Sequence, residues 1–249
     1  MEKQNIYQDI SARTGGEIYL GVVGPVRSGK STFIKRFMEL LVLPEIKDEN
    51  ERKRTMDELP QSGTGKMVMT TEPKFIPKEA AELPMEDMKI KIRLIDCVGF
   101  MIPGAGGNLE NGQERLVKTP WFDYEVPFTK AAEFGTRKVI RDHSTIGILV
   151  TADGSFGEIP RDSYVEAEKK TVVELNEIGK PFLVLVNSER PYSKATQALT
   201  EKLSKEYNTS VMAVNCDQLR QEDILEILKN VLLEFPLSSV GFYLPKWVE

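Results

Sequence analysis

The stretch Gly24-Pro25-Val26-Arg27-Ser28-Gly29-Lys30-Ser31 fits the pattern G-x-x-x-x-G-K-S, which marks a phosphate-binding loop between a strand and a helix. The apolar run 18–23 precedes it and the helix-like run 32–41 follows it, so the pattern has that context. Glycines at both ends let successive N–H groups turn inward, and the helix start adds its positive dipole end. The alternative, an ordinary glycine turn, does not explain this context. We therefore expect a nucleotide-phosphate site.

The individual residues of the loop have expected roles. Lys30 is expected to contact the β- and γ-phosphates, and the hydroxyl of Ser31 is expected to bind Mg²⁺. The remaining phosphate contacts are expected from the other loop residues and the first helical turn, namely Gly24, Val26, Arg27, Ser28, Gly29 and Thr32.

The composition is that of a globular protein and excludes some partners. The 249 residues are 41% hydrophobic and 29% charged, which suits one large domain with at most a small appendage. A net charge of −5 gives no basic field for nucleic acid. Both cysteines, Cys97 and Cys216, lie in or beside apolar runs, so we expect buried reduced thiols. With no signal peptide and no apolar run of about 20 residues, a cytoplasmic location is expected.

Apolar strands alternate with helical patterns in the second half of the chain. The expected strands are 145–150, 181–186 and 210–214, and the expected helices are 162–178, 193–206 and 221–235. Residues 74–77 and 88–96 predict an antiparallel hairpin at the sheet edge. The fold class is therefore α/β, a three-layer P-loop NTPase sandwich with a mainly parallel sheet. The expected domain organisation is a lead-in (1–16), the NTPase domain (17–236) and a C-terminal stub (237–249).

Two polar stretches are expected to be largely irregular. Residues 44–69 are irregular, and from Gln61 onward no apolar period appears, which indicates a mobile loop; the charged cluster 47–54 is a solvated helix or loop face. The glycine-rich stretch 102–120 indicates a second long switch loop, with a disordered insertion as the alternative.

Further chemistry is expected at two places beside the phosphate loop. Asp96 leaves an apolar strand, where such enzymes hold Mg²⁺, and Gly99 lets its N–H approach a γ-phosphate. Thr70 and Thr71 lie ahead of the edge strand, where a threonine closes on Mg²⁺ in switch-type hydrolases. Thr70 is slightly favoured as the metal ligand, and a solvated Thr-Thr turn is the alternative. The candidate catalytic residues are thus Lys30, Thr70, Thr71 and Asp96.

Two departures from common GTPase patterns set further expectations. Phe100 follows Gly99, where a glutamine often orients the attacking water, so slow hydrolysis is expected. Asn187-Ser188-Glu189-Arg190 stands where GTPases carry N-K-x-D, and Arg190 has no acceptor for guanine. Adenine is favoured, with Asn187 and Glu189 as candidate base contacts, over a pocket that does not discriminate. The single histidine, His143, is read as a helix-end residue rather than a base.

The phosphate loop, the Thr70-Thr71 pair, Asp96 to Gly99 and the altered Asn187 to Arg190 motif together resemble a known family. The strings 7–21, 24–32 and 94–100 make the chain similar to the N-terminal nucleotide-binding domain of the stage IV sporulation protein A family, spore-coat morphogenetic ATPases. The resemblance implies a translation-factor-related GTPase fold that has turned to ATP and Mg²⁺. It implies hydrolysis coupled to self-assembly into a static polymer on the forespore surface, on the mother-cell side.

The resemblance also implies partners and roles. The partners are other copies of the protein, a small amphipathic forespore-membrane peptide and other coat proteins, without nucleic acid. In the resemblance, Lys30 binds phosphate, Thr70 and Thr71 sense the γ-phosphate, and Asp96 belongs to the metal site. The alternatives are a GTP-dependent regulatory switch and a scaffold that holds nucleotide without turnover.

Overall fold

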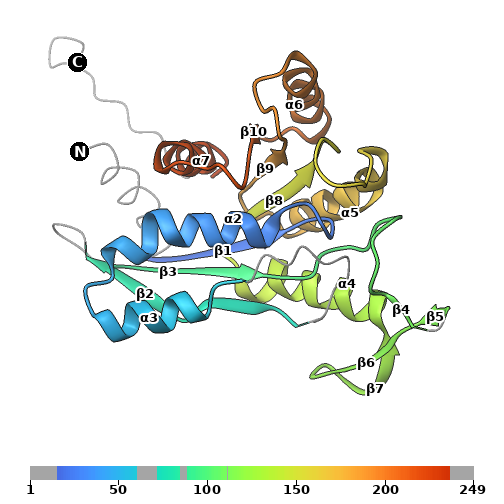
Figure 1. The fold of residues 1–249 in the computed structure, drawn as a ribbon, viewed down its shortest axis with the longest axis horizontal. Helices are drawn as coiled ribbons and strands as arrows, with labels where there is room; N and C mark the ends of the chain where they lie inside the picture. Colours follow the sequence, from blue (N-terminus) through green and yellow to red (C-terminus); the bar gives the residue numbers. More distant parts are fainter. Residues whose placement is uncertain (1–15, 61–71, 85–88, 111, 236–249) are drawn as a thin grey trace, which may run out of the picture.

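A computed structural model describes residues 16–60, 72–84, 89–110 and 112–235. Its centre is a six-stranded sheet in the order β10-β9-β8-β1-β3-β2 (Figure 1). The pairs β1–β3, β1–β8, β8–β9 and β9–β10 are parallel, and only β2 runs antiparallel, against β3. The strands are β1 (Glu17–Val23), β2 (Lys74–Pro84), β3 (Lys89–Asp96), β8 (Ile146–Ala152), β9 (Phe182–Asn187) and β10 (Val211–Val214).

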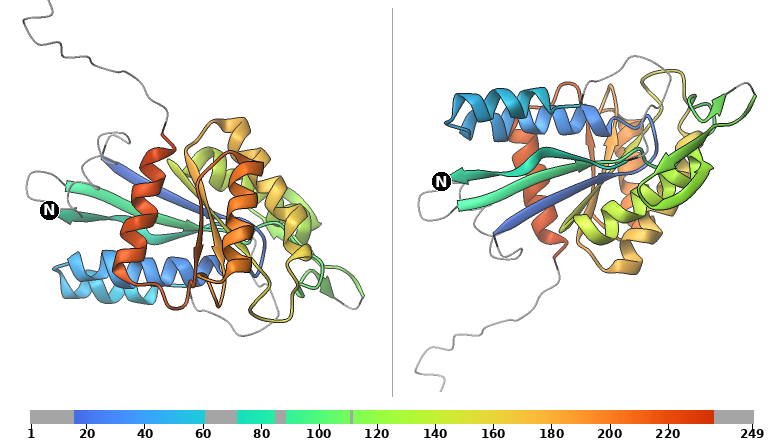
Figure 2. Two further views of the ribbon diagram at one scale, coloured as in Figure 1. Left: turned by 90° about the horizontal axis from the view of Figure 1, so that it is seen from above. Right: turned by 90° about the horizontal axis from the view of Figure 1, so that it is seen from below.

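The helices cover both faces of this sheet (Figures 1 and 2). They are α2 (Lys30–Phe37), α3 (Glu49–Asp57), α4 (Phe128–Lys138), α5 (Asp162–Ile178), α6 (Lys194–Tyr207) and α7 (Gln221–Leu233). A π-turn, Met38–Val42, and a 3₁₀ turn, Leu43–Glu45, continue α2, and a second π-turn, Val139–His143, continues α4. The predicted three-layer α/β sandwich with an antiparallel edge hairpin is confirmed.

Strand alternation divides the core between the two faces. In β1, Leu20 and Val22 pack with α2 and α7, whereas Val23 belongs to the cluster formed with α5 and α6. All seven residues of β8 are buried, as expected for a central parallel strand covered on both sides. The parallel strands therefore end together at one edge of the sheet, where the phosphate loop begins.

Several predicted boundaries hold, and others differ. The helix predicted over 162–178 is α5, and the strands predicted near 146, 182 and 211 are found. The edge strand predicted over 74–77 continues to Pro84, because an irregularity between Ile76 and Ala81 lets it resume pairing with β3.

The polar stretch 44–69 is helical in its first part, where the charged cluster 47–54 was expected to be a solvated helix or loop face. Helix α3 lies there, and the Asp48 carboxylate caps it by accepting the Glu51 N–H over 2.7 Å. Its side chains are polar on almost every face, so the sequence has no apolar periodicity that would predict this helix. The second part, 61–71, lies outside the described residues, as do the predicted stub 237–249 and all of the lead-in except Gly16.

The stretch predicted as a long loop, 102–120, contains short strands instead. β4 (Leu109–Glu110) pairs with β5 (Gln113–Glu114), and β6 (Leu116–Thr119) pairs with β7 (Phe122–Pro127). These two hairpins project from the body ahead of α4, which no sequence pattern had predicted (Figure 1). Trp121 and Phe122 pack their rings on Phe134 of α4, at 5.4 and 5.0 Å between centroids, and so attach the β6–β7 hairpin.

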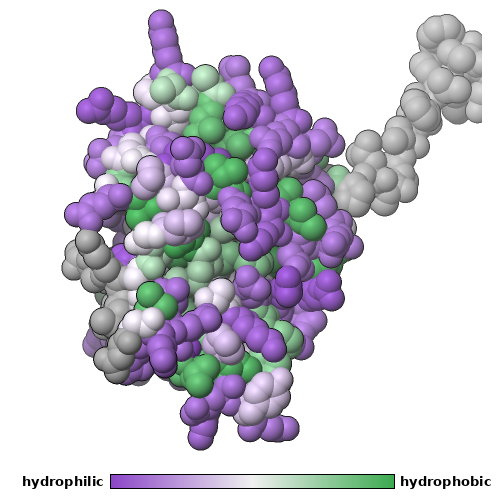
Figure 3. All heavy atoms as spheres, turned by 90° about the vertical axis from the view of Figure 1, so that its right-hand side faces the viewer, coloured by the Kyte–Doolittle hydropathy of each residue, from purple (hydrophilic) through white to green (hydrophobic). Residues whose placement is uncertain are grey.

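The surface mixes polar and apolar side chains. Figure 3 shows a face on which hydrophilic side chains dominate and hydrophobic ones lie between them. Within the described ranges, no helix combines the length and the apolar character needed to cross a bilayer.

Candidate nucleotide-phosphate site

The phosphate loop follows β1 directly and leads into α2, at the edge where the parallel strands end (Figure 1). Its backbone is left-handed at Gly24 (φ 126°), Arg27 (φ 64°) and Gly29 (φ 104°). A Cβ built on Gly24 would lie 2.4 Å from the carbonyl oxygen of Val150, so only glycine fits there. The predicted strand–loop–helix geometry is therefore present.

Lys30 is buried at the start of α2, with 5% of its surface exposed. Its Nζ donates to the carbonyl oxygens of Pro25 (2.5 Å) and Gly24 (3.3 Å), so the ammonium lies within the loop. Burial lowers the pKa of Lys30, and the charges of Cys97 and Asp96 oppose that shift. An incoming phosphate would place a further negative charge beside this buried ammonium.

Gly99 lies so close to the phosphate loop that a side chain would not fit there. A Cβ on Gly99 would lie 2.0 Å from the Gly24 carbonyl oxygen and 2.7 Å from Lys30 Nζ. Its φ of 90° also favours glycine. The backbone after β3 is thus next to the ammonium that is expected to hold phosphate.

Ser31 and Asp96 meet across the start of α2 and the end of β3. The Ser31 hydroxyl donates to Asp96 Oδ2 over 2.7 Å, and Asp96 Oδ1 is buried without a hydrogen-bond partner among the described residues. Burial raises the pKa of Asp96, while the Ser31 bond and the Lys30 charge lower it. An unpaired carboxylate oxygen beside a hydroxyl fits Mg²⁺, which prefers oxygen ligands.

The rest of a Mg²⁺ shell would come from outside the protein. No group of three or more His, Cys, Asp or Glu side chains that could hold a metal occurs in the described part of the chain. Mg²⁺ commonly takes one or two protein oxygens and completes its octahedron with water and substrate phosphates. The donor set of Ser31 and Asp96 therefore suits a metal shared with a bound nucleotide.

Phe100 is held in the core beside the phosphate loop. Its carbonyl accepts the Val26 N–H over 2.9 Å, and only 1% of its surface is exposed. The ring shares a cluster with Val26, Ile102 and Tyr164. The sequence shows that glutamine is missing at this position, but not that Phe100 fastens the segment after β3 to the phosphate loop.

Asn187, at the end of β9, connects the phosphate loop to the neighbouring strand. Its Nδ2 donates to the Ser28 carbonyl over 3.1 Å, and its Oδ1 accepts the Cys216 N–H over 3.0 Å. A Cβ on Gly29 would lie 2.3 Å from Asn187 Nδ2, so glycine is needed where this amide approaches. The structure thus places Asn187 against the loop backbone, and its contact with a base stays a prediction.

The other predicted site residues lie at varying distances from this centre. Thr32 is half-buried in α2, whereas Glu189 and Arg190 are exposed beyond β9. The Glu189 N–H donates to Ser155 Oγ over 2.8 Å, which joins the loops after β8 and β9. Thr70 and Thr71 lie outside the described residues.

Asp153, just after β8, is a hydrogen-bonded acid between the loops after β8 and β9 that the sequence analysis did not single out. It accepts the Ser155 N–H (2.9 Å) and the Thr196 hydroxyl (3.2 Å). Burial raises its pKa, but hydrogen bonds from Ser155, Ser188 and Thr196 outweigh that effect, and the net shift is downward. The available signal was an acid directly after an apolar strand, as at Asp96.

The cysteine and histidine predictions agree with the structure. Cys97 and Cys216 are free and buried, and burial raises the pKa of Cys97 to about 11. His143 ends the π-turn after α4, with its ring edge-on to Phe75 at 5.2 Å. Burial lowers the pKa of His143.

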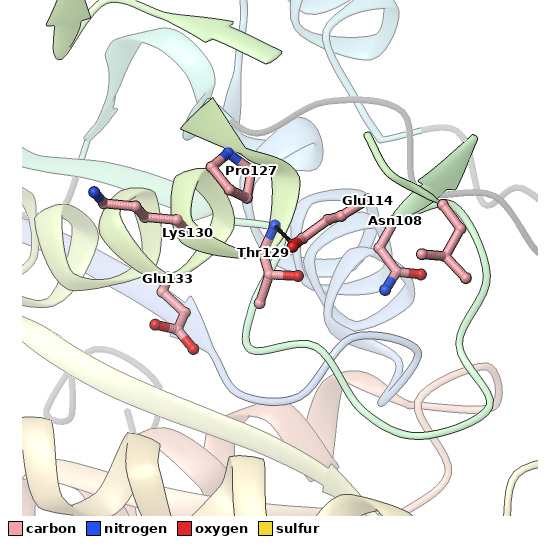
Figure 4. Close-up of a pocket in the computed structure, with 7 residues that line it drawn as sticks. Asn108, Glu114, Pro127, Thr129, Lys130 and Glu133 are labelled. Carbon is pink, nitrogen blue, oxygen red and sulfur yellow. Dashed lines mark hydrogen bonds between the residues drawn. The ribbon is translucent and has the colours of Figure 1, made fainter. Parts of the chain in front are cut away.

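A cavity of about 460 Å³ lies apart from these residues, between the β4–β5 hairpin and the start of α4 (Figure 4). It is lined by Asn108, Leu109, Glu114, Pro127, Thr129, Lys130 and Glu133. Glu114 accepts the Thr129 N–H over 3.2 Å and so already occupies the start of α4. No phosphate-loop residue lines it.

Comparison with known proteins gives a consistent result. The sequence pattern of the family described as stage IV sporulation protein A, ATPase domain, matches residues 1–236. The chain is 51% identical to stage IV sporulation protein A of Bacillus subtilis and of Bacillus anthracis over 249 residues, which is 100% of this chain and 51% of each relative. It is also 51% identical to that of Clostridioides difficile over 246 residues, 98% of this chain and 50% of the relative.

The chain therefore spans about half the length of the curated relatives it matches. Among solved structures, a crystal structure of a variant of SsGBP matches with a TM-score of 0.46 and 19% identity, over 94% of this chain and 62% of that one.

Proposed function

The chain belongs to the stage IV sporulation protein A family, in the part that carries its ATPase domain, and from this premise we propose that it is a slow Mg²⁺-dependent ATPase. The observation that carries the proposal is the grouping of Lys30, Ser31, Asp96 and Gly99 around one glycine-bounded loop. They provide an ammonium group, two oxygen ligands for a metal, and a backbone segment that lies against the phosphate loop. Phosphoryl transfer requires groups of these kinds.

The proposal assigns a role to each of these residues. The loop and the start of α2 bind the phosphates through backbone N–H groups, and Lys30 neutralises their charge. Ser31 and Asp96 hold the metal, which when bound supplies charge neutralisation at the phosphate oxygens. Gly99 offers its N–H near the γ-phosphate, and Thr70 or Thr71 couples that phosphate to loop closure.

Slow turnover follows from Phe100. Its ring is buried and has no polar atom, so this side chain does not orient an attacking water. The same observation favours a second candidate, a scaffold that holds nucleotide without turnover. The two differ in Mg²⁺-dependent phosphate release from ATP. We expect release above that of Lys30→Ala; release equal to that variant would favour the scaffold.

We expect adenine rather than guanine as the base. Arg190 stands exposed beyond β9 and offers only donors, whereas guanine recognition in GTPases uses an acidic acceptor at that place. A GTP-dependent regulatory switch is the alternative, and direct competition between the two nucleotides separates them.

For the whole protein we propose that hydrolysis drives self-assembly on the forespore surface, on the cytoplasmic mother-cell side. The proposed partners are further copies of the protein, a small amphipathic forespore-membrane peptide and other coat proteins. Family membership supports this. Sedimentation of the full-length protein tests the assembly step. Polymer should form with ATP and fail to form with a non-hydrolysable analogue, and equal assembly with both would refute the coupling.

A further inference from the structure

Two consecutive carbonyls of the phosphate loop are bound from outside by side chains. The Ser28 carbonyl accepts Asn187 Nδ2 over 3.1 Å, and the Arg27 carbonyl lies 3.5 Å from the hydroxyl of Tyr164, which donates to it. Arg27 is left-handed without being a glycine, with φ 64°. Such a conformation costs about 1 to 2 kcal/mol for an ordinary residue, so surrounding contacts must maintain it.

The direction of a carbonyl fixes the direction of the next N–H. A trans peptide unit is planar, and its C=O and N–H point to opposite sides. Because Tyr164 contacts the Arg27 carbonyl, the Ser28 N–H points away from Tyr164. A phosphate loop binds the α- and β-phosphates through N–H groups of this kind.

Tyr164 is rigidly placed for this contact. It lies in the first turn of α5, only 1% of its surface is exposed, and its ring packs with Val26, Phe100 and Ile102. Burial raises the pKa of its hydroxyl, which therefore keeps its proton and remains a donor.

The start of α5 is itself anchored to the end of β8. The guanidinium of Arg161 donates to the Thr151 hydroxyl (3.0 Å) and the Ala152 carbonyl (3.1 Å). The same group makes two bonds to the Glu168 carboxylate, at 2.5 and 2.8 Å, and Glu168 is fully buried. Tyr164 thus projects from a helix start that cannot easily shift.

We propose that Tyr164 is a positioning residue of the phosphate loop. Its hydroxyl holds the Arg27 carbonyl outward, so the Ser28 N–H is presented to the phosphates of a nucleoside di- or triphosphate. This inference rests on the proposed nucleotide binding and adds a residue to it.

The test is Tyr164→Phe, which removes the hydroxyl and keeps the buried ring. We expect the Kd for ATP to rise about threefold, near the lower end for one neutral hydrogen bond, because the oxygen–oxygen distance of 3.5 Å is long. The Kd for ADP should rise by the same factor, because the contact concerns the α- and β-phosphates. KM should rise while kcat stays within about twofold, and Tm should stay near wild type.

Two controls make the result interpretable. Tyr192→Phe alters a tyrosine that is 82% exposed and should leave the Kd unchanged. Lys30→Ala should lose affinity strongly. If wild type and Lys30→Ala both fail to bind ATP, the proposed function fails; if only Lys30→Ala loses affinity, the role of Tyr164 alone fails. A Kd for Tyr164→Phe within twofold of wild type, or a rise explained by the unfolded fraction at the assay temperature, overturns the assignment.

Discussion

The Ser31 hydroxyl donates to Asp96 Oδ2 over 2.7 Å, which joins the first turn of α2 to the last residue of β3. The two residues come from different motifs of the sequence, and the parallel pairing of β1 with β3 brings them together. The other carboxylate oxygen, Oδ1, has no hydrogen-bond partner within the described residues. This arrangement is the structural basis for expecting a metal between α2 and β3.

Asp96→Asn should weaken the binding of Mg²⁺ at the site while leaving the fold intact. Asparagine keeps the shape but removes the charge that would attract Mg²⁺, so the Mg²⁺ concentration for half-maximal ATP binding should rise at least about tenfold. Asp142→Asn is the matched control, because Asp142 is exposed and pairs with Lys138 on the surface. A Mg²⁺ dependence identical to wild type in Asp96→Asn would remove Asp96 from the metal site.

The double variant Thr70→Ala with Thr71→Ala should bind ATP and fail to hydrolyse it. A sensor threonine acts through loop closure on the γ-phosphate, so ground-state affinity should stay within a few-fold while phosphate release falls to the Lys30→Ala background. The single variants identify the residue that matters. Normal hydrolysis by the double variant means that neither threonine is the sensor.

Competition between ATP and GTP should favour ATP. Arg190 offers no acceptor to guanine, and restoring one with Arg190→Asp should improve GTP binding relative to ATP. Lys194→Asp, an equal charge change at an exposed position at the start of α6, controls for electrostatics. A wild-type preference for GTP of tenfold, about 1.4 kcal/mol, would contradict the adenine assignment.

Glu168→Gln should destabilise the domain by about 3 to 5 kcal/mol, the usual cost of breaking a buried ion pair. Glu168 accepts two bonds from Arg161 and one from the Tyr207 hydroxyl, and none of its surface is exposed. Glu166→Gln, in an exposed pair with Lys170, should cost less than about 1 kcal/mol. Urea unfolding of both variants measures the difference, and equal midpoints would show that the buried pair contributes nothing.

The sequence predicted best the elements that are buried at helical spacing or along a continuous apolar run. Helix α5, with one buried face, was predicted over its whole length, and the fully buried strands β8 and β9 were predicted within two residues at each end. For helix α3 the sequence could not decide between a solvated helix and a loop, because its side chains are polar nearly all round. The β6–β7 hairpin was missed because Asp123, Tyr124 and Glu125 are all exposed and show no alternation.

The candidate site divides in the same way. The phosphate loop, Asp96 and Gly99 are recognisable because their motifs are local. Two contacts join residues that are far apart in the sequence: Asn187 with Ser28, 159 positions apart, and Tyr164 with Arg27, 137 positions apart. No local sequence pattern predicts such contacts. Such contacts depend on how the strands and helices pack, which only the fold reveals.

The most direct test of the account is calorimetric titration of ATP with Mg²⁺ into the wild-type chain and into Lys30→Ala. The account predicts one saturable site in the wild type and a loss of affinity of at least about tenfold in the variant, because a buried ammonium facing phosphate is removed. Equal binding by the two chains, or no binding by the wild type, would contradict the assignment of this loop as a nucleotide site.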